Sequence, residues 1–460
     1  MTPQPLHNNP KTIIFCLGCL SALAMAPVYA WPLMMLGYAT LTYYLINCDE
    51  WKKGSVVTFL FFFGYFLTGL YWISSSLFID FERWWWALPF SFVGLPILLS
   101  LFPLFIVGTA LFFIKKHIKS KLISVFFIII AIIATDFARS FLFTGFPWNL
   151  PAHTWVNTDI LMSLLPKIGF FGLNTLTILL FCLPAIFSHK IRTYYVAALI
   201  IITFVPAPIT KSNYFSAPDN IIMVQANIPQ NEKWDRQFIK RNFDRYIDKS
   251  LGAIVNSKPH IIIWPETAIS YYLLNHDQFR TKFQNFLADL PPESILITGV
   301  LTYNDNQDHF NSIIVYDRLG QVIARYDKHH LVPFGEYMPF GLDTITGFNN
   351  FKSGSPPEVL DTPLGQFIPL ICYESIFSHY ADYEAEERIL LNLTNDAWFG
   401  HTAGPYQHFD HMIFRAMETG SLALRLSGNG ISAIISPDGK TSDVTALNKF
   451  GLITTKPLTK

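Results

Sequence analysis

Seven apolar runs fill most of the first 210 residues, and they restrict this half of the chain to structures that lipid tolerates. A helix needs about 20 apolar residues to cross ~30 Å of hydrocarbon, where every backbone polar group must be paired internally. Only 14% of all residues are charged, against about 25% in a typical soluble protein. We therefore predict a helical membrane bundle with seven spans, at about residues 12–29, 31–47, 55–78, 86–114, 122–138, 168–188 and 193–210.

Two details of this half allow more than one interpretation. The first run ends in VYA at 28–30, a pattern loosely similar to a signal-peptide cleavage site. Another run follows at once with Pro32 near its start, so we favour a retained first span. Asp136 and Arg139 end the fifth run, just before TGFPW at 144–148. They indicate either a functional site or an interfacial ion pair beside an aromatic anchor.

Basic residues indicate how the bundle is oriented. One set belongs to the N-terminus and alternate loops, and consists of Lys11, Lys52, Lys53, Lys115, Lys116, Lys119, Lys121, Lys190 and Arg192. The opposite loops hold Arg83, Arg139 and Lys167. Lys and Arg concentrate on the cytoplasmic side, and an odd number of spans then places everything after residue 210 on the other side. We expect a transmembrane domain at 1–210 and an exported remainder.

The five cysteines show no spacing typical of a metal site or a disulfide framework: Cys16, Cys19, Cys48, Cys182 and Cys372. The first two form a C-x-x-C, which inside an apolar run is more typical of small hydrophobic side chains than of a redox pair. Only Cys372 lies outside the membrane half. A lone thiol in a region that faces an oxidising compartment needs a reason, and nucleophilic catalysis is one. The formal net charge is zero, so electrostatics do not favour nucleic acid as a partner.

From about residue 218 the pattern changes to short β-rich runs divided by polar stretches. Strands are predicted at 221–226, 261–264, 294–300, 311–316, 322–326, 367–372, 389–393 and 431–435, and amphipathic helices at 237–255 and 278–290. Strands that alternate with helices indicate an α/β domain with a layered sheet core. We place this domain at 218–450, followed by a polar C-terminal tail at 451–460.

Three predicted strands end in groups that together can transfer an acyl group: Glu266, Lys328 and Cys372. A thiol must lose its proton to attack, and free Cys with a pKa of ~8.5 is mostly protonated at neutral pH. A carboxylate in an apolar pocket can act as the general base, and an ammonium can stabilise the oxyanion.

Each of these residues also has a plainer interpretation. Glu266 could lie in the first turn of a helix, Lys328 could be a solvated charge at a strand end, and Cys372 could be a core residue. Taken singly, the plainer interpretation is favoured for each. Their joint occurrence at predicted strand ends favours an active site, although spacing alone does not establish one.

Several motifs resemble the apolipoprotein N-acyltransferase family of the nitrilase superfamily, and the resemblance covers nearly the whole chain. The most specific is YDKHHLVPFGEY at 326–337. The others are TGFPW at 144–148, VQANIPQ at 224–230 with KW at 233–234, WPET at 264–267, CYE at 372–374, NDAWFG at 395–400, QH at 407–408 and RAME at 415–418. The resemblance implies an αββα sandwich with Glu266, Lys328 and Cys372 as the catalytic triad.

The same resemblance implies roles for four further residues. Glu336 would orient or assist Lys328, Tyr373 and Glu374 would support the nucleophile, and Trp234 would contact lipid or gate the cavity. A loop ion pair for Glu336 and an interfacial anchor for Trp234 remain alternatives.

The family's activity implies a phospholipid acyl donor and a diacylglyceryl apolipoprotein acceptor, joined through a thioester on Cys372. It also implies a multi-pass protein of the bacterial inner membrane, with the catalytic domain on the periplasmic side. No metal or nucleotide cofactor is expected, since no P-loop or zinc motif occurs. Alternatives are a membrane-tethered amidase or nitrilase with water as acceptor, and a transporter or receptor with an inactive exported domain. The intact triad and the scarcity of ionisable residues in the spans argue against the last.

Two departures from the family pattern stand out. Family members usually carry an eighth span after the catalytic domain, whereas this sequence ends in a polar stretch, so its C-terminus is expected to stay outside. After Arg425 the family tends to have an Asn-Thr-Gly step, and here SGNG occupies 427–430. Neither departure affects the predicted triad.

Overall fold

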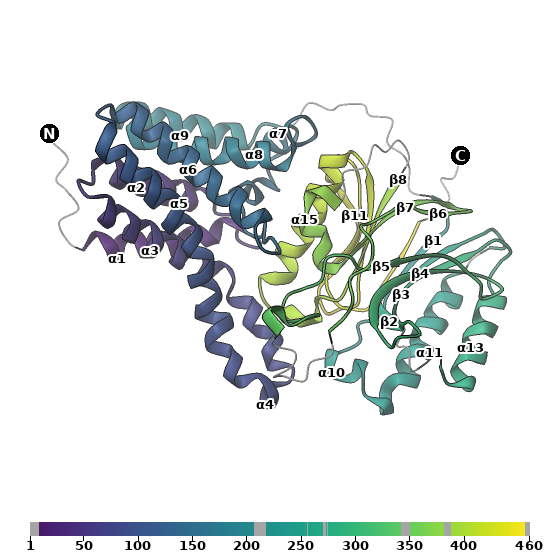
Figure 1. Ribbon diagram of the computed structural model, residues 1–460. Helices are drawn as coiled ribbons and strands as arrows, with labels where there is room; N and C mark the ends of the chain where they lie inside the picture. Colours follow the sequence, from purple (N-terminus) through teal and green to yellow (C-terminus); the bar gives the residue numbers. More distant parts are fainter. Residues whose placement is uncertain are drawn as a thin grey trace. The chain divides into compact units, whose positions relative to one another are not determined.

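The protein divides into two compact units in a computed structural model, which describes residues 9–206, 218–254, 256–269, 273, 275–341, 350–380 and 388–455. The helical unit comprises the chain up to residue 209 together with residues 401–410. The α/β unit holds the remainder of the C-terminal half. Figure 1 shows the helices of the first unit and the sheets of the second.

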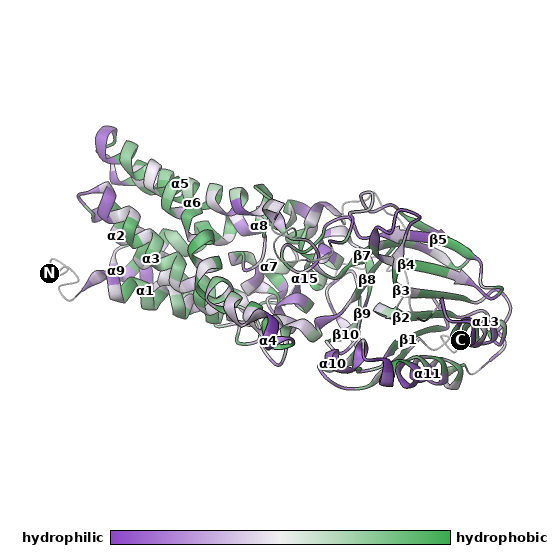
Figure 2. Ribbon diagram, turned by 60° about the horizontal axis from the view of Figure 1, so that its bottom comes forward, coloured by the Kyte–Doolittle hydropathy of each residue, from purple (hydrophilic) through white to green (hydrophobic). Residues whose placement is uncertain are grey.

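Each of the seven apolar runs contains helix in the helical unit. Its α-helices are α1 (Pro10–Ser21), α2 (Trp31–Asn47), α3 (Trp51–Gly69), α4 (Phe81–Trp84), α5 (Leu95–His117), α6 (Lys121–Phe141), α7 (Asp159–Met162), α8 (Leu165–Cys182) and α9 (His189–Thr203). Apolar residues predominate along most of them (Figure 2).

Fewer of the described helices are long and apolar enough to span a membrane than the sequence predicts. Three described helical segments are long and apolar enough to cross a membrane: Phe90–His117, Lys121–Phe141 and Leu165–Ile186. A fourth is possible if Trp51–Gly69 and Tyr71–Phe78, bent by 43°, form one span. By contrast α1, α2 and α9 have 12, 17 and 15 residues, fewer than the ~20 that a straight span needs. Seven spans therefore remain a prediction.

Asp136 and Arg139 lie inside the helical unit, and both side chains are buried. Arg139 pairs with Asp136 at 3.4 Å and donates hydrogen bonds to the carbonyl oxygens of Phe146 (2.8 Å) and Trp148 (2.6 Å). A buried guanidinium needs such partners, because an unpaired charge in an apolar interior is strongly unfavourable. The pair thus holds the loop that follows α6, rather than lying at an exposed edge.

Residues 401–410, although late in the sequence, pack in the helical unit. The side-chain oxygen of Gln407 accepts hydrogen bonds from the indole nitrogens of Trp72 (3.2 Å) and Trp148 (2.9 Å), and all three side chains are buried. The first turns of α15 (Gly404–Thr419) therefore belong to this unit. The sequence did not predict α15.

Two six-stranded sheets form the frame of the α/β unit, in the orders β12-β1-β2-β3-β4-β5 and β11-β10-β9-β8-β7-β6. The strands are β1 (Ile221–Gln225), β2 (Ile261–Ile269), β3 (Ile295–Tyr303), β4 (His309–Asp317), β5 (Val322–Asp327), β6 (Leu360–Thr362), β7 (Gly365–Ile371), β8 (Arg388–Thr394), β9 (Leu422–Ser427), β10 (Ser432–Ile435), β11 (Thr441–Thr445) and β12 (Gly451–Thr454). Within them β1–β2–β3 and β7–β8–β9 pair in parallel. The predicted α/β domain is confirmed, with two sheets.

The facing sides of the two sheets share one apolar core. Ile261 and Ile263 contribute from the first sheet, and Ile389 and Leu391 from the second. The helices α11 (Arg236–Ala253) and α13 (Asp277–Ala288) cover the other face of the first sheet, so that β1 to β3 are buried on both faces (Figure 1). This double burial explains the nearly continuous apolar runs of these strands.

Local sequence explains why α11 forms where it does. The side chain of Asp235 caps the helix by accepting a hydrogen bond from the backbone N–H of Gln237 at 2.9 Å, which satisfies a donor at the helix start. Buried residues then recur three and four positions apart, as a helix packed on one face requires. They are Ile239, Asn242, Phe243, Tyr246, Ile247, Ser250 and Ala253.

The tail expected from residue 451 begins later than predicted. Residues 451–454 form β12, which pairs antiparallel with β1 and places Leu452 opposite Val224. A strand of four residues at a sheet edge carries too little apolar periodicity to be recognised from sequence. The strands β6, β9 and β11 were not predicted either.

A pronounced bulge interrupts the pairing of β2 with β3. Trp264 pairs with Thr298, and the next registered pair is Ile269 with Val300. Between these pairs β2 advances five residues (264 to 269) while β3 advances two (298 to 300). Residues 265–268 therefore leave the regular ladder, as the extra residues of a β-bulge do.

Gly299 of β3 lies directly against this bulge. A Cβ atom at this position would come within 2.4 Å of the Thr267 nitrogen and 2.5 Å of both the Glu266 Cα and the Pro265 oxygen. All three are backbone atoms, which cannot turn aside as a flexible side chain can. The bulge thus requires glycine here.

We predict that Gly299→Ala lowers the thermal unfolding temperature of the full chain in detergent, because overpacking of this kind costs about 1–3 kcal/mol. Gly252→Ala in α11 is the matched control. No atom lies within 4 Å of a Cβ built there, and alanine favours a helix by about 1 kcal/mol over glycine. Equal unfolding temperatures for the two variants would contradict the proposed close approach.

Candidate active site

The bulge of β2 carries Glu266 into the interior of the α/β unit. The next residue, Thr267, adopts a left-handed backbone conformation with φ 51°, which a β-branched residue rarely does. Only 6% of Glu266 is exposed. Its Oε1 accepts a hydrogen bond from the Nδ2 of Asn311 at 2.7 Å, whereas its Oε2 is buried with no hydrogen-bond partner among the described residues.

Burial raises the pKa of the Glu266 carboxyl, and the nearby Lys328 ammonium opposes that rise. A carboxylate with a raised pKa and one unpaired oxygen is suited to accept a proton. Such perturbed groups are concentrated at functional sites.

Lys328 follows β5 directly and is almost fully buried, with 1% of its side chain exposed. Its backbone N–H donates to the carbonyl oxygen of Asn311 at 2.8 Å, which fixes the start of the side chain. Its Nζ lies 2.9 Å and 2.8 Å from the two carboxylate oxygens of Glu336. Burial alone would lower the pKa of Lys328, but the surrounding negative groups, Glu336 above all, raise it. The side chain is therefore an ammonium.

Glu336 is itself held in place by more than Lys328. Its Oε1 accepts a second hydrogen bond from the Nδ2 of Asn311 at 3.0 Å, and its Oε2 accepts one from the backbone N–H of Val332 at 2.8 Å. Asn311 thus bridges the carboxylates of Glu266 and Glu336. The arrangement sets two acids and one cation in a fixed geometry.

Cys372 begins the 3-10 turn Cys372–Ile376 immediately after β7, with φ 51° and 9% of its surface exposed. A positive φ at a non-glycine residue is strained, and such strain is found at functional sites. Burial raises the pKa of the thiol, as does Glu266, while Lys328 lowers it. At rest the sulfur therefore carries its proton and needs a base to remove it.

Glu374 holds the turn that begins at Cys372 through its carboxylate. Its Oε1 accepts hydrogen bonds from the hydroxyl of Tyr326 (2.6 Å) and the backbone N–H groups of His329 (2.9 Å) and His330 (3.0 Å). Its Oε2 accepts one from the backbone N–H of Ile371 at 2.7 Å. Four donors on a fully buried carboxylate join the turn after β7 to the segment after β5.

Tyr373 and Trp234 differ in their surroundings. The Tyr373 ring is buried and packs edge-on against Phe377 at 5.3 Å and beside His330 at 5.7 Å. Trp234 is 41% exposed, and the Nζ of Lys233 lies 5.5 Å from its ring centre.

Three buried side chains behind Cys372 were not assigned a role from sequence. The hydroxyl of Thr394 donates to Asp396 at 3.0 Å, and Asp396 pairs with Arg425 at 2.8 Å. The Thr394 side chain also lies within hydrogen-bonding reach of Cys372, where it acts to lower the pKa of the thiol. The sequence could have indicated that Thr394 lies near Cys372, because both residues stand at the carboxyl ends of strands. The strands β7 and β8 are parallel, and the carboxyl ends of parallel strands meet at one edge of a sheet.

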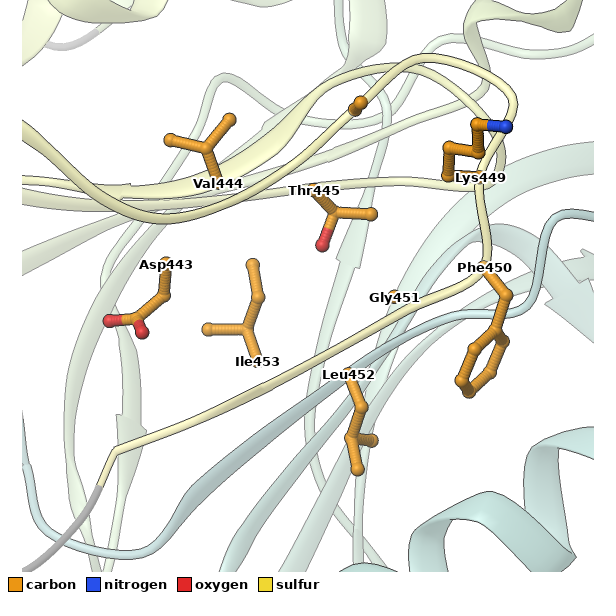
Figure 3. A pocket seen from close by; sticks show the side chains of 9 residues that line it. Asp443, Val444, Thr445, Lys449, Phe450, Gly451, Leu452 and Ile453 are labelled. Carbon is orange, nitrogen blue, oxygen red and sulfur yellow. The ribbon is translucent and has the colours of Figure 1, made fainter.

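Other features of the α/β unit do not coincide with this cluster. A hollow of about 330 Å³ lies between β11 and β12, lined by residues 443–446 and 449–453 (Figure 3). Its lining includes none of the buried groups described above, which are Glu266, Lys328, Glu336, Cys372 and Glu374. In the part of the chain that the structure describes, no group of three or more His, Cys, Asp or Glu side chains is placed to hold a metal ion.

Comparison with known proteins gives matches to both halves of the chain. The carbon-nitrogen hydrolase family matches residues 222–456, and the apolipoprotein N-acyltransferase N-terminal domain matches residues 17–183. The apolipoprotein N-acyltransferase of Rickettsia prowazekii is 33% identical over 96% of this chain and 91% of its own length. The chain belongs to the apolipoprotein N-acyltransferase family.

A second relative agrees with this assignment. The apolipoprotein N-acyltransferase of Brucella suis biovar 1 is 33% identical over 85% of this chain and 77% of its own length. Among solved structures, an amidase from Nesterenkonia sp. matches 54% of this chain and 95% of its own, with 17% identity and a TM-score of 0.37. Family membership rests on the sequence relatives.

We predict that Glu336→Gln moves the alkaline limb of the acyltransferase pH profile to lower pH. Without the Glu336 charge, burial lowers the pKa of Lys328, so the ammonium is lost at a lower pH than in the wild type. Activity at the alkaline end should fall ~10-fold or more, because the Lys328 ammonium is expected from the sequence to stabilise the oxyanion. Exposed Glu358→Gln is the control, and identical alkaline limbs for the two variants would refute the coupling.

Proposed function

We propose that this protein N-acylates apolipoproteins during lipoprotein maturation. It moves a fatty acyl group from a membrane phospholipid through a thioester on Cys372 to the amine of an N-terminal diacylglyceryl-cysteine. The observation that supports this most directly is that Glu266, Lys328 and Cys372 are all buried, with Glu266 linked to Lys328 through Asn311 and Glu336. An acid with a free oxygen, an ammonium and a thiol are the parts that covalent acyl transfer needs.

In the first half-reaction Glu266 takes the proton of Cys372, and the sulfur attacks the ester carbonyl of the phospholipid. Lys328 stabilises the negative charge that develops on the carbonyl oxygen. The carbon–oxygen bond of the ester then breaks, and the departing lysophospholipid oxygen receives the proton from Glu266. A thioester remains on the sulfur.

In the second half-reaction the amine of the diacylglyceryl-cysteine attacks the thioester carbonyl. Glu266 accepts a proton from the amine as the carbon–nitrogen bond forms. The carbon–sulfur bond breaks, and Glu266 returns the proton to the sulfur of Cys372. The product is an amide, and the enzyme is back in its starting state.

Four neighbours support this chemistry in the proposal. Glu336 keeps Lys328 charged and oriented, and Glu374 fixes the turn that presents the nucleophile. Tyr373 is the second residue of the turn that Cys372 begins, and its backbone N–H can join Lys328 in stabilising the oxyanion. Trp234 contacts a lipid chain or gates the site, in keeping with its exposed indole.

The rival function is a membrane-tethered amidase that uses the same three groups with water as acceptor. Incubation of the purified protein with phospholipid and a diacylglyceryl peptide separates the two. Acylated peptide supports transfer, whereas ammonia released from small amides, without acylated peptide, supports hydrolysis.

We predict that wild-type protein incubated with phospholipid alone gains the mass of one acyl group, because no acceptor amine is present to release it. Treatment with hydroxylamine should remove this mass, as it does for a thioester. Cys372→Ala and Cys372→Ser should show no hydroxylamine-sensitive mass and no peptide acylation, although both still insert in membranes. Intact-mass spectrometry measures each result.

The exposed Cys16 of α1 provides the control. Cys16→Ala should gain and lose the acyl mass as the wild type does. A hydroxylamine-sensitive adduct that persists in Cys372→Ala would show that the nucleophile lies elsewhere.

We further propose the arrangement in the membrane that the sequence predicts. Residues 1–210 form a seven-span domain of the bacterial inner membrane, and residues 218–450 form a periplasmic αββα catalytic sandwich. The separate grouping of the helical unit and the two-sheet core of the α/β unit support this division.

Labelling with a membrane-impermeant maleimide tests this orientation. In a chain whose native cysteines are replaced, Asp305→Cys should react in intact spheroplasts, and Lys119→Cys should react only after the membrane is permeabilised. Both side chains are exposed, so burial does not protect either thiol. Equal reactivity of the two thiols before permeabilisation would contradict the predicted topology.

A further inference from the structure

A second lysine lies at the proposed active site, on the short helix α10 (Gln230–Lys233). The Nζ of Lys233 donates hydrogen bonds to the backbone carbonyl oxygen of Glu266 at 3.1 Å and to the hydroxyl of Thr267 at 2.5 Å. Both acceptors belong to the bulge of β2. From the sequence, Lys233 is only part of the KW pair at 233–234, with no predicted role of its own.

These two hydrogen bonds act on a segment of β2 that is not held by regular pairing with β3. The bulged residues 265–268 have left the regular pairing with β3, and Thr267 has a left-handed φ of 51°. A conformation of this kind costs about 1–3 kcal/mol and persists only where its surroundings hold it. Because Gly299 has no side chain, the bulge can approach β3 closely. Lys233 holds the bulge by donating hydrogen bonds to the Glu266 carbonyl oxygen and the Thr267 hydroxyl.

The charge of Lys233 also acts on the carboxyl of Glu266. Burial lowers the pKa of Lys233 to about 8, while Glu266 and Cys372 act to raise it. In return, the Lys233 cation lowers the pKa of the Glu266 carboxyl. Lys328 and the hydrogen bond from Asn311 also lower the pKa of the Glu266 carboxyl, and Glu336 raises it.

We propose that Lys233 is a positioning residue for Glu266, which fixes the bulge that carries this acid and places a cation beside it. The inference rests on the proposed acylation of Cys372, because Glu266 is the base in that step. Lys233 touches the backbone beside the acid rather than the reacting sulfur. Its contribution therefore has two separable parts, a geometric one through hydrogen bonds and an electrostatic one through charge.

The test measures acylation of Cys372 by phospholipid in a single turnover, followed by intact mass across a range of pH. The wild type is compared with Lys233→Met, Lys233→Arg and Thr267→Val. Lys240→Met, an exposed lysine replaced in the same way on α11, is the matched control. The thermal unfolding temperature of each variant in detergent shows whether it folds.

Lys233→Met removes both parts, so acylation should slow ~10-fold or more, and the acid limb should move to higher pH because Glu266 loses a stabilising cation. Lys233→Arg keeps the charge and should keep the acid limb at the wild-type position. Thr267→Val removes one hydrogen bond but no charge, and should slow acylation without moving the limb. Lys240→Met should behave as the wild type.

Two results would overturn the inference while leaving the proposed function intact. One is a wild-type rate and acid limb in Lys233→Met. The other is a Lys233→Met rate that falls equally at every pH, with Lys233→Arg no better, which would indicate a structural role alone. Absence of any thioester on the wild type would instead overturn the proposed function.

Discussion

The α/β unit depends on keeping ionised groups stable in an interior that excludes water. Removing a carboxylate or an ammonium from water costs several kcal/mol unless partners replace the lost hydration. Here Lys328 is paired with Glu336, and Asn311 donates to both Glu336 and Glu266. Only one carboxylate oxygen, the Oε2 of Glu266, is buried without a partner among the described members of this cluster. In the proposed mechanism this unpaired oxygen receives the proton of Cys372.

The two sheets set the positions of Glu266, Lys328 and Cys372, and irregularities in the strands set the directions of their side chains. Glu266 lies on a bulge, Cys372 begins a strained turn, and Lys328 follows the last residue of its strand. Regular strands alternate their side chains between two faces, and that alternation alone would leave the three groups on separate surfaces. Glycine at 299 and the four donors to Glu374 stabilise the departures from regularity. Strain of this kind is typical of sites that do chemistry.

The helical unit shows that the boundary between the two parts is not a single cut in the sequence. Residues 401–410 belong to it, because Gln407 satisfies the buried indoles of Trp72 and Trp148. The helix α15 therefore begins in one unit and ends in the other.

The sequence by itself indicated the apolar helical half, the α/β class of the C-terminal half, and the residues proposed as the triad with their helpers. It could do so because apolar length, strand-sized runs and the motifs around Glu266, Lys328 and Cys372 are local in the chain. Tertiary structure alone decided which partners surround these residues. Asn311, Thr394 and Lys233 are ordinary polar residues in their own segments, and they gain importance only because the bulge and the parallel strand ends bring distant segments together. The strand at 451–454 and the placement of residues 401–410 were likewise outside the reach of sequence, since both depend on pairing with segments far away in the chain.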